Sequence, residues 1–394
     1  MKTIYVDNNA TTQVAPEVFE EMTPYFTELY GNPSSMHFFG GQVERKVEEA
    51  RERVAGLLGA RPQEIIFTSC GTESDNAAIM SALRCNPDKR HVVTTRVEHP
   101  AVKNVVSHLK REGYRVTELP VDRQGLLSME EVSRVMTDDT AIVSVMWANN
   151  ETGVLFPVEE IATMAKSRDI VFHTDAVQAV GKIPINMADN QIDMMSLSGH
   201  KLHAPKGIGV LYVRRGTRFA PFVIGGHQEG GRRGGTENVP YIIGLGKACE
   251  LAATNFKEKN LRVKSLRDKL EKGLLQSIEN SMINGDREQR LPNTSSISFE
   301  YVEGESILLK LSDKGICASS GSACTSGSLE PSHVLRAMGV PFTAAHGSIR
   351  FSLSSYNTEE EIDYILEVVP PIIKQLREIS PFWKEAVIRS CSAS

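Results

Sequence analysis

The feature that most constrains the fold of this chain is an alternation of strand-like and helix-like segments from about residue 60 to residue 213. Several of the strand-like segments are near-continuous apolar runs rich in valine and isoleucine, which is typical of strands covered on both faces. The expected strands are Glu64–Ser69, His91–Val97, Ala141–Trp147, Ile170–Ala176, Ile192–Ser198 and Gly207–Val213. Strands separated by helices in this way predict an α/β fold, with a mainly parallel sheet between two layers of helices.

Helix signals lie between these strands. Ser128 and Glu131 have the spacing of a capping box, and Pro157 precedes a segment with apolar residues at helical spacing. After about residue 250 we expect one long helix over Lys247–Ile278, with Leu261, Leu266, Leu270 and Leu274 along it. Further expected elements are strands at Ser295–Phe299, Ile316–Ser319 and Ser348–Leu353, a helix at Glu305–Ser312, and a final helix capped by Thr358 and Glu361.

The length of the chain predicts two domains, because a single core rarely grows past about 250–300 residues. We expect a large domain over residues 15–255 and a small α+β domain formed by residues 1–14 and 256–394. Charges of both signs are mixed along the chain, for a net charge of -5, which argues against nucleic-acid binding. The apolar runs are far shorter than the ~20 residues that span a bilayer, and no signal peptide is evident, so we expect a cytoplasmic protein without membrane contact.

The six cysteines are scattered and form no Cys-x-x-Cys pair. This spacing argues against a disulfide framework and against a structural zinc site, so we expect no metal. Most of the six are expected to be plain core residues, Cys317 among them. Cys324 is the exception, because it lies in SSGSACTSGSLEPSH, a segment too poor in apolar residues to be buried. An exposed thiol there can act, as a thiolate, as a strong nucleophile.

Lys201 follows an apolar strand directly, in the sequence Ser198-Gly199-His200-Lys201. The ends of strands in an α/β sheet are where ligands usually bind, and a deprotonated lysine there can form an imine with an aldehyde cofactor. A lone lysine at this position is more often an ordinary surface residue. The ends of the neighbouring strands favour the functional interpretation.

Asp175 ends the preceding strand, and Gln178 follows three residues later. A carboxylate at a strand end can bind a protonated pyridine nitrogen, which keeps the ring an electron sink, as the chemistry of pyridoxal phosphate requires. Gln178 can donate to the phenolic oxygen of that ring. Taken alone, Asp175 is equally well explained as a helix N-cap. An acid on one strand and a lysine at the end of the next form a more specific signal.

Residues 69–74, Ser-Cys-Gly-Thr-Glu-Ser, follow the strand at Glu64–Ser69 and open a helix. Gly71 lets the backbone approach an anion, Thr72 offers a hydroxyl, and the helix N-terminus supplies N–H groups. Ser198 and His200 can complete a phosphate site. Taken alone, the segment is a helix cap. It is not a Walker loop, because no Gly-Lys-Ser/Thr follows, and a Rossmann fingerprint is also absent after the first strand.

Three further groups lie near these strand ends or beyond them. His99 can stack on a cofactor ring and move protons, although a lone histidine is more often structural, and Asn149–Gly153 adds polar side chains at the same edge. The glycine-rich stretch 225–238 has two arginines and Thr236, which can reach an anion, including one across a subunit interface. Arg350 can grip a substrate carboxylate with two hydrogen bonds, and its alternative is a surface ion pair.

The whole chain, from YVDNNATT at residues 5–12 to the last helix, resembles the NifS/IscS-type cysteine desulfurases of the class V aminotransferase superfamily. The motifs that carry the resemblance are VEHPA, HTDAVQ, SGHK, GGTEN and the loop at about residues 319–331. SCGTESDN, SVMWANNETG and ISPFW look closer to the nitrogenase-associated branch. The tail Lys384–Ser394, with Cys391, has no match.

The resemblance implies a transferase of fold type I that binds pyridoxal phosphate, in a homodimer with active sites near the subunit interface. It implies that Lys201 holds the cofactor, Asp175 pairs with the ring nitrogen and Gln178 contacts the phenolic oxygen. The implied phosphate ligands are Gly71, Thr72, Ser198, His200 and Thr236 of the partner subunit. His99 stacks on the ring, and Asn150 and Arg350 position the substrate carboxylate.

The implied reaction takes sulfur from L-cysteine, leaving L-alanine and a persulfide on Cys324 that is delivered to an iron–sulfur scaffold protein. An ordinary thiol has a pKa of about 8.5, so Cys324 needs a base, and His99 and the substrate are the two candidates. An aminotransferase or a selenocysteine lyase of the same fold is an alternative. A non-catalytic sulfur-carrier or scaffold-binding protein is an alternative of another class.

Overall fold

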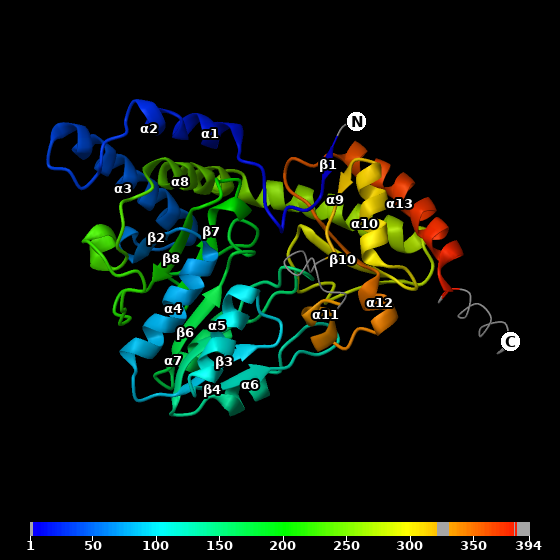
Figure 1. Ribbon diagram of the computed structural model, residues 1–394, viewed down its shortest axis with the longest axis horizontal. Coiled ribbons are helices and arrows are strands. Elements are labelled where there is room, and N and C mark those ends of the chain that lie inside the picture. Colours follow the sequence, from blue (N-terminus) through cyan, green and yellow to red (C-terminus); the bar gives the residue numbers. More distant parts are fainter. Residues whose placement is uncertain (1–2, 321–330, 382, 384–394) are drawn as a thin grey trace.

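The computed structural model describes residues 3–320, 331–381 and 383, and its larger part is built on a seven-stranded sheet of order β2-β8-β7-β6-β5-β3-β4 (Figure 1). Its strands are β2 (Ile65–Thr68), β3 (His91–Thr95), β4 (Arg115–Leu119), β5 (Thr140–Ser144), β6 (Val171–Asp175), β7 (Met194–Ser198) and β8 (Gly209–Val213). All of them run parallel except β8, which is antiparallel to both of its neighbours. The predicted mainly parallel sheet is confirmed.

Two strands of this sheet differ from the expectation. β8 is antiparallel because only a short 3-10 turn and a few further residues join it to β7, and a parallel return needs a much longer crossover. β4 was not expected at all. It is an edge strand whose first residue is exposed and whose next three are only partly buried, so it lacks the continuous apolar run that marks the central strands.

Helices cover both faces of the sheet, as predicted. α4 (Gly71–Cys85) and α5 (Pro100–Arg111) pack on one face. The other face is covered by α1 (Pro16–Met22), α3 (Phe38–Leu58), α6 (Met129–Val135), α7 (Val158–Lys166) and α8 (Val239–Ala253). Ile66 packs under the first layer and Phe67 under the second, because successive residues of a strand point to opposite faces. Pro157 precedes α7 and Ser128 caps α6, as expected.

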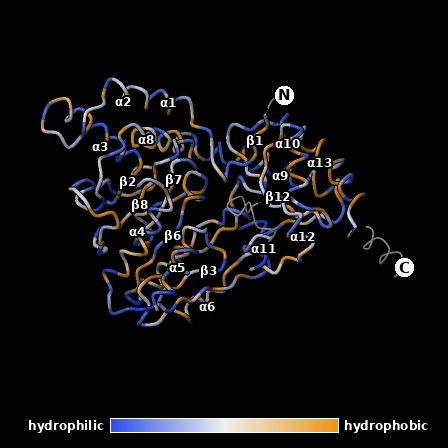
Figure 2. Tube along the Cα trace, viewed as in Figure 1, coloured by the Kyte–Doolittle hydropathy of each residue, from blue (hydrophilic) through white to orange (hydrophobic). Residues whose placement is uncertain are grey.

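A second, separate core is formed mainly by the C-terminal part of the chain. The antiparallel sheet β12-β10-β9 (Ser348–Ser352, Thr294–Phe299, Ser281–Ile283) packs against α9 (Phe256–Ser277), α10 (Gly304–Asp313) and α13 (Glu359–Ile379). β1 (Ile4–Tyr5) joins this part through parallel pairing with β11 (Ile316–Cys317). Hydrophobic segments, orange in Figure 2, run through both parts of the molecule. The boundary of the two predicted domains stays a prediction.

The single helix expected over Lys247–Ile278 is wrong. The chain forms α8 and α9 instead, and Asn255 between them has a left-handed φ of 52° that interrupts the helical hydrogen bonds. Leu266, with the later leucines, is buried, whereas Leu261 is 57% exposed. Five residues correspond to about 140° of rotation around a helix, so Leu261 lies on a different face from Leu266. In the described part of the chain, no helix is long and apolar enough to cross a membrane.

Candidate active site

The ends of β2, β6 and β7 meet at Gly71, the first residue of α4. A Cβ atom at this position would lie 2.7 Å from Cγ2 of Val177 and 3.5 Å from Cβ of Ser198, so only glycine lets the helix begin this close to both segments. Cys70 precedes the helix, and its side chain makes no capping hydrogen bond. The N-terminus of α4 therefore offers backbone N–H groups beside Thr72 and Ser198, as a phosphate site requires.

Asp175 ends β6 as a buried carboxylate. One of its oxygens accepts a hydrogen bond from the N–H of Val177 at 2.9 Å, so the local N-cap-like interpretation is also correct. Burial raises the pKa of Asp175, against the opposing effects of His99 and Lys201. No lysine or arginine among the described residues forms an ion pair with it. A buried acid of this kind fits a cationic group from outside the chain, such as a protonated pyridine nitrogen.

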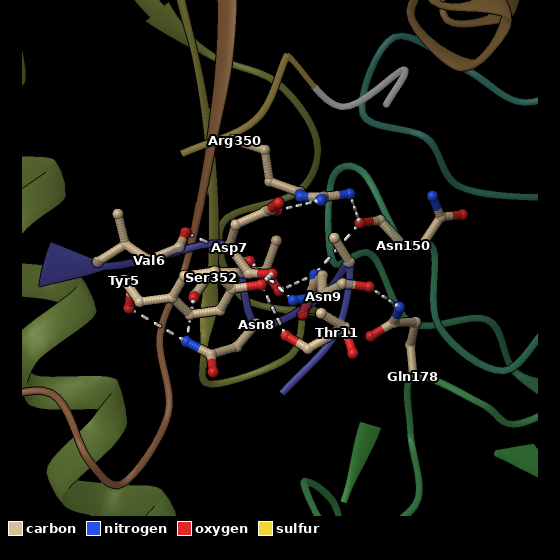
Figure 3. Close-up of polar contacts among 12 residues, drawn as sticks. Tyr5, Val6, Asp7, Asn8, Asn9, Thr11, Asn150, Gln178, Arg350 and Ser352 are labelled. Atoms are coloured by element: carbon tan, nitrogen blue, oxygen red, sulfur yellow. Dashed lines mark hydrogen bonds and ion pairs between the residues drawn. The ribbon is translucent and has the colours of Figure 1, made fainter. Parts of the chain in front are cut away.

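Lys201 ends the 3-10 turn Gly199–Lys201 that follows β7, and its Nζ donates to the carbonyl oxygens of Asn9 and Ala10, both at 2.6 Å. Gln178 reaches the same Asn9 carbonyl through Nε2 at 2.9 Å (Figure 3), and its Oε1 accepts from Lys182 at 2.8 Å. Burial lowers the pKa of Lys182 to about 7, but a carbonyl can only accept, so the Asn9 carbonyl sets the orientation of the Gln178 amide and the hydrogen bond from Lys182 supports it. Its second N–H remains for another acceptor.

Arg350, on β12, is buried and bound to residues from two other segments (Figure 3). One terminal nitrogen donates to the carbonyl oxygen of Asn150 at 3.0 Å, and the other pairs with the carboxylate of Asp7 at 2.6 Å. Its Nε is buried without a hydrogen-bond partner among the described residues. Asn9 donates to the same Asn150 carbonyl at 3.2 Å, which joins Arg350 to the network around Lys201. Arg350 does form an ion pair, as the alternative expected, but its side chain is buried and only Asp7 is partly exposed.

Two histidines of the site are neutral at pH 7. His99 caps α5, and its Nδ1 accepts a hydrogen bond from the N–H of Ala101 at 3.2 Å, so the neutral ring carries its proton on Nε2. Burial, with a further effect of Lys201, lowers the pKa of His99. Burial and nearby lysines also lower the pKa of His200 to about 4, and its Nδ1 lies 3.1 Å from the hydroxyl of Thr11.

Sequence analysis missed a group of buried ionisable side chains beneath this edge. Glu98 accepts hydrogen bonds from Thr95 and from the N–H of Met146, and burial raises its pKa to about 8. Burial also raises the pKa of Asp75, whose Oδ1 lies 3.6 Å from His173 Nε2. Glu98 and His173 belong to the motifs VEHPA and HTDAVQ, but no pattern in the sequence indicates that they are buried without a charged partner.

The glycine-rich stretch 225–238 is another part of the expected site. The arginines of the glycine-rich stretch are already used within the chain, because Arg233 pairs with Glu73 at 2.9 Å and Arg232 donates to the carbonyl oxygen of Gln63. That they bind an anion stays a prediction. Thr236 lines a small cavity of about 140 Å³ beside the end of β2. Its role in a partner subunit stays a prediction.

The cysteines also differ from the expectation. Of the four that the structure describes, Cys249 is buried, whereas Cys70, Cys85 and Cys317 are partly exposed, so most of these are not core residues. Cys324 and Cys391 lie outside the described residues. Within the described ranges, no cluster of His, Cys, Asp and Glu could hold a metal ion.

Comparison with known proteins agrees with this geometry. The family model of the class-V aminotransferases matches residues 4–365. Cysteine desulfurase 2 of Trichormus variabilis is 62% identical over 382 residues, which cover 97% of this chain and 96% of the relative. The cysteine desulfurase NifS of Azotobacter vinelandii is 59% identical over 384 residues, with the same coverage of both chains.

Solved structures show the same similarity over nearly the whole chain. A NifS-like protein superposes with a TM-score of 0.89 and 41% identity, over 95% of this chain and 100% of that one. SspA in complex with cysteine superposes with a TM-score of 0.79 and 35% identity, over 90% of this chain and 100% of that one. The chain therefore belongs to the class-V aminotransferase family, among its NifS/IscS-type cysteine desulfurases.

Proposed function

We propose that this cysteine desulfurase binds pyridoxal phosphate on Lys201, takes sulfur from L-cysteine and holds it as a persulfide on Cys324. The observation that carries the proposal is Asp175, a buried carboxylate that forms no ion pair with a lysine or arginine of the described residues. It lies on the strand beside the one that leads to Lys201, at the edge where α4 begins. This is the arrangement that a phosphorylated pyridine with an aldehyde group needs.

Each part of the cofactor has a matching group on the chain. Asp175 would pair with the ring nitrogen, and the second N–H of the Gln178 amide would donate to the phenolic oxygen. The phosphate would be held by Gly71, Thr72, Ser198, His200 and Thr236 of the partner subunit. When bound, the cofactor supplies an electron sink that makes the α-proton of an amino acid labile. The neutral His99 ring stacks on the cofactor.

The substrate carboxylate binds to Arg350 and to the side chain of Asn150. Arg350 is already held in place by Asp7 and by the Asn150 carbonyl, so little orientation is lost when the substrate arrives. Its buried Nε–H, which has no hydrogen-bond partner among the described residues, is one donor for the carboxylate. The amine of Lys201, once displaced, accepts the α-proton of the substrate.

Proton transfer near the sulfur is divided between His99 and the substrate. Because Nδ1 of His99 is occupied by the N–H of Ala101, the neutral ring holds a proton on Nε2 that it can donate. It is therefore better suited to donate than to accept. Of the two candidate bases for Cys324, the substrate is favoured.

The covalent step moves one sulfur atom. The Cys324 thiolate attacks the sulfur of L-cysteine, an S–S bond forms, and the C–S bond breaks with its electron pair going to the substrate carbon. That carbon takes up a proton, the amine of Lys201 returns the α-proton to the α-carbon, and L-alanine leaves. Ser319, five residues before Cys324, is hydrogen-bonded to the main chain of Arg350 in both directions. Five residues span at most about 18 Å, so chain length permits Cys324 to reach the substrate.

The persulfide is then delivered to an acceptor, which we propose is an iron–sulfur scaffold protein. We also propose that the desulfurase itself is a homodimer. A role connected with nitrogenase is supported by the similarity to NifS of Azotobacter vinelandii. A cytoplasmic location stays a prediction.

The test is a visible spectrum of the protein with pyridoxal phosphate before and after L-cysteine, with alanine and persulfide quantified. We expect an absorbance change and alanine without any added keto acid. Cys324→Ala should keep the absorbance change and lose the persulfide. Cys85→Ala, which removes a partly exposed thiol at the other end of α4, is the matched control and should behave as wild type. Alanine that requires a keto acid would point to an aminotransferase instead.

A further inference from the structure

The segment directly after residues 321–330 is attached to two active-site loops. Ser332 begins α11 (His333–Ala337) as its N-cap, and its Oγ accepts hydrogen bonds from the N–H groups of Val334 at 3.1 Å and Leu335 at 3.3 Å. The same hydroxyl is hydrogen-bonded to the carboxylate of Glu151, in the loop after β5. The next residue, His333, places Nε2 3.0 Å from the carbonyl oxygen of Glu98, in the loop after β3.

The direction of the hydrogen bond between Ser332 and Glu151 is settled by the other partners of the hydroxyl. Because Oγ already accepts from two backbone N–H groups, its single proton is directed to the carboxylate, and Glu151 is the acceptor. Glu151 is itself held by its main chain, since its N–H and that of Thr152 both donate to Oδ1 of Asn149, at 2.9 and 3.0 Å. The carboxylate is therefore a fixed point of attachment for the start of α11.

Burying a carboxylate costs free energy, so a buried acid is an unusual attachment point for a short helix. Glu151 is 4% exposed, and burial raises its pKa against the opposing effects of Ser332, Arg350 and Lys103. The preceding residue, Asn150, receives the guanidinium of Arg350 on its carbonyl oxygen. One turn of chain thus contacts both the candidate carboxylate-binding arginine and the segment that follows Cys324.

We propose that Glu151 is a positioning residue for sulfur transfer, which acts through Ser332 to fix the N-cap of α11, eight residues after Cys324. The inference rests on the proposed function, because it assumes that Cys324 takes sulfur from L-cysteine. It assigns Glu151 no role in binding the cofactor or L-cysteine. Loss of the attachment slows the attack of Cys324 on the substrate sulfur and leaves the preceding binding step unchanged.

The experiment uses the full-length protein with its cofactor and measures two quantities. Binding of L-cysteine is followed by the change in cofactor absorbance, and persulfide on Cys324 is followed by mass spectrometry after quenching within a single turnover. For Glu151→Leu and Ser332→Ala we expect persulfide formation to slow by about tenfold or more, with L-cysteine binding changed by less than about twofold. Glu151→Gln and Ser332→Thr keep the acceptor and the hydroxyl, and should retain most of the rate.

A matched control separates attachment from simple loss of a helix cap. Ser128 caps the short helix α6 through the N–H of Glu131, and no hydrogen bond among the described residues joins Ser128 to Glu151 or Ser332. Ser128→Ala should therefore leave persulfide formation unchanged. The variant with both Glu151→Leu and Ser332→Ala should be no slower than the slower single variant, because both changes break one interaction.

The outcomes distinguish this inference from the proposed function. If the wild-type protein forms no persulfide on Cys324, the proposed function fails. If the wild type forms it and folded Ser332→Ala forms it equally fast, only the role of Glu151 is overturned. Equal slowing of L-cysteine binding and persulfide formation would also overturn it, because it would place Glu151 in the substrate site. Should Glu151→Leu fail to fold, the Ser332→Ala and Ser332→Thr pair decides.

Discussion

Two buried glutamates, one in each part of the molecule, have opposite surroundings: one has a charged partner and the other has only neutral ones among the described residues. Glu271, on α9 in the C-terminal part, receives two hydrogen bonds from Arg290, both at 2.7 Å, and a third from Ser295. Although burial alone would raise its pKa, these partners lower it. Glu98, at the edge of the large sheet, accepts hydrogen bonds only from neutral groups among the described residues, and burial raises its pKa to about 8.

The difference indicates which part of the molecule is built for stability and which for chemistry. In the C-terminal part, a buried charge has its counter-charge within the fold. At the active-site edge, Glu98, Asp75 and Asp175 are buried with raised pKa values and no lysine or arginine pair in the described chain. Such an edge is costly for the empty protein and favourable once a cationic ligand supplies the missing charge.

The largest expected effect is that of Arg290→Ala, which removes the charged partner of Glu271. It leaves the Glu271 carboxylate buried without its partner, and we expect the free energy of unfolding to fall by about 3–5 kcal/mol. Urea unfolding of the wild type and the variant at pH 7 measures this. Replacing both residues together, as Glu271→Leu with Arg290→Met, should recover most of the loss. A loss below about 1 kcal/mol for Arg290→Ala would remove the distinction between the two parts.

At the active-site edge, Asp175→Asn should have opposite effects on stability and on activity. The neutral amide no longer needs a cation, so the cofactor-free protein should be at least as stable as the wild type. Alanine production should fall by roughly 100-fold or more, because the ring nitrogen loses its counter-charge. Thermal unfolding of the cofactor-free protein and a desulfurase assay of the loaded protein test the two halves. A variant that is less stable but fully active would contradict the interpretation of Asp175.

Glu98→Gln should change the pH dependence of stability. The folded pKa of Glu98 is about 8, well above its ordinary value of 4.5, so the unfolded chain releases a proton that the folded protein keeps. Stability from this group is therefore complete below pH 4.5 and is lost as the pH rises toward 8. We expect the variant to exceed the wild type by about 4 kcal/mol at pH 8 and by nearly nothing at pH 4.5. Parallel unfolding curves at both pH values would refute the raised pKa.

The smallest expected effect is that of Lys182, whose Nζ supports the orientation of Gln178. Lys182→Met removes one hydrogen bond, worth about 1 kcal/mol, so kcat/KM should fall by about fivefold. The pH titration of the cofactor absorbance should shift as well, because Gln178 then holds the phenolic oxygen less firmly. Lys182→Arg keeps a donor and should titrate as the wild type does. Identical titrations for Met and Arg would exclude this role.

Local patterns in the sequence were sufficient for the fold class and for most of the candidate site. Apolar runs with helices between them predict the central sheet, and polar motifs at the strand ends predict that Lys201, Asp175 and Gly71 come together. The reason is physical: parallel strands of one sheet end at a common edge. The capping box of Thr358 and Glu361 was likewise predictable, because it depends on residues three apart.

Only the tertiary structure decided which partners the charged groups have. Asp7 and Arg350 are 343 residues apart, and Ser332 and Glu151 are 181 apart, so no local pattern could pair them. The helix break at Asn255 and the unpaired state of Glu98 also depend on packing between distant segments. Local preferences and hydrophobic spacing act over a few residues, whereas burial and charge pairing are properties of the assembled fold.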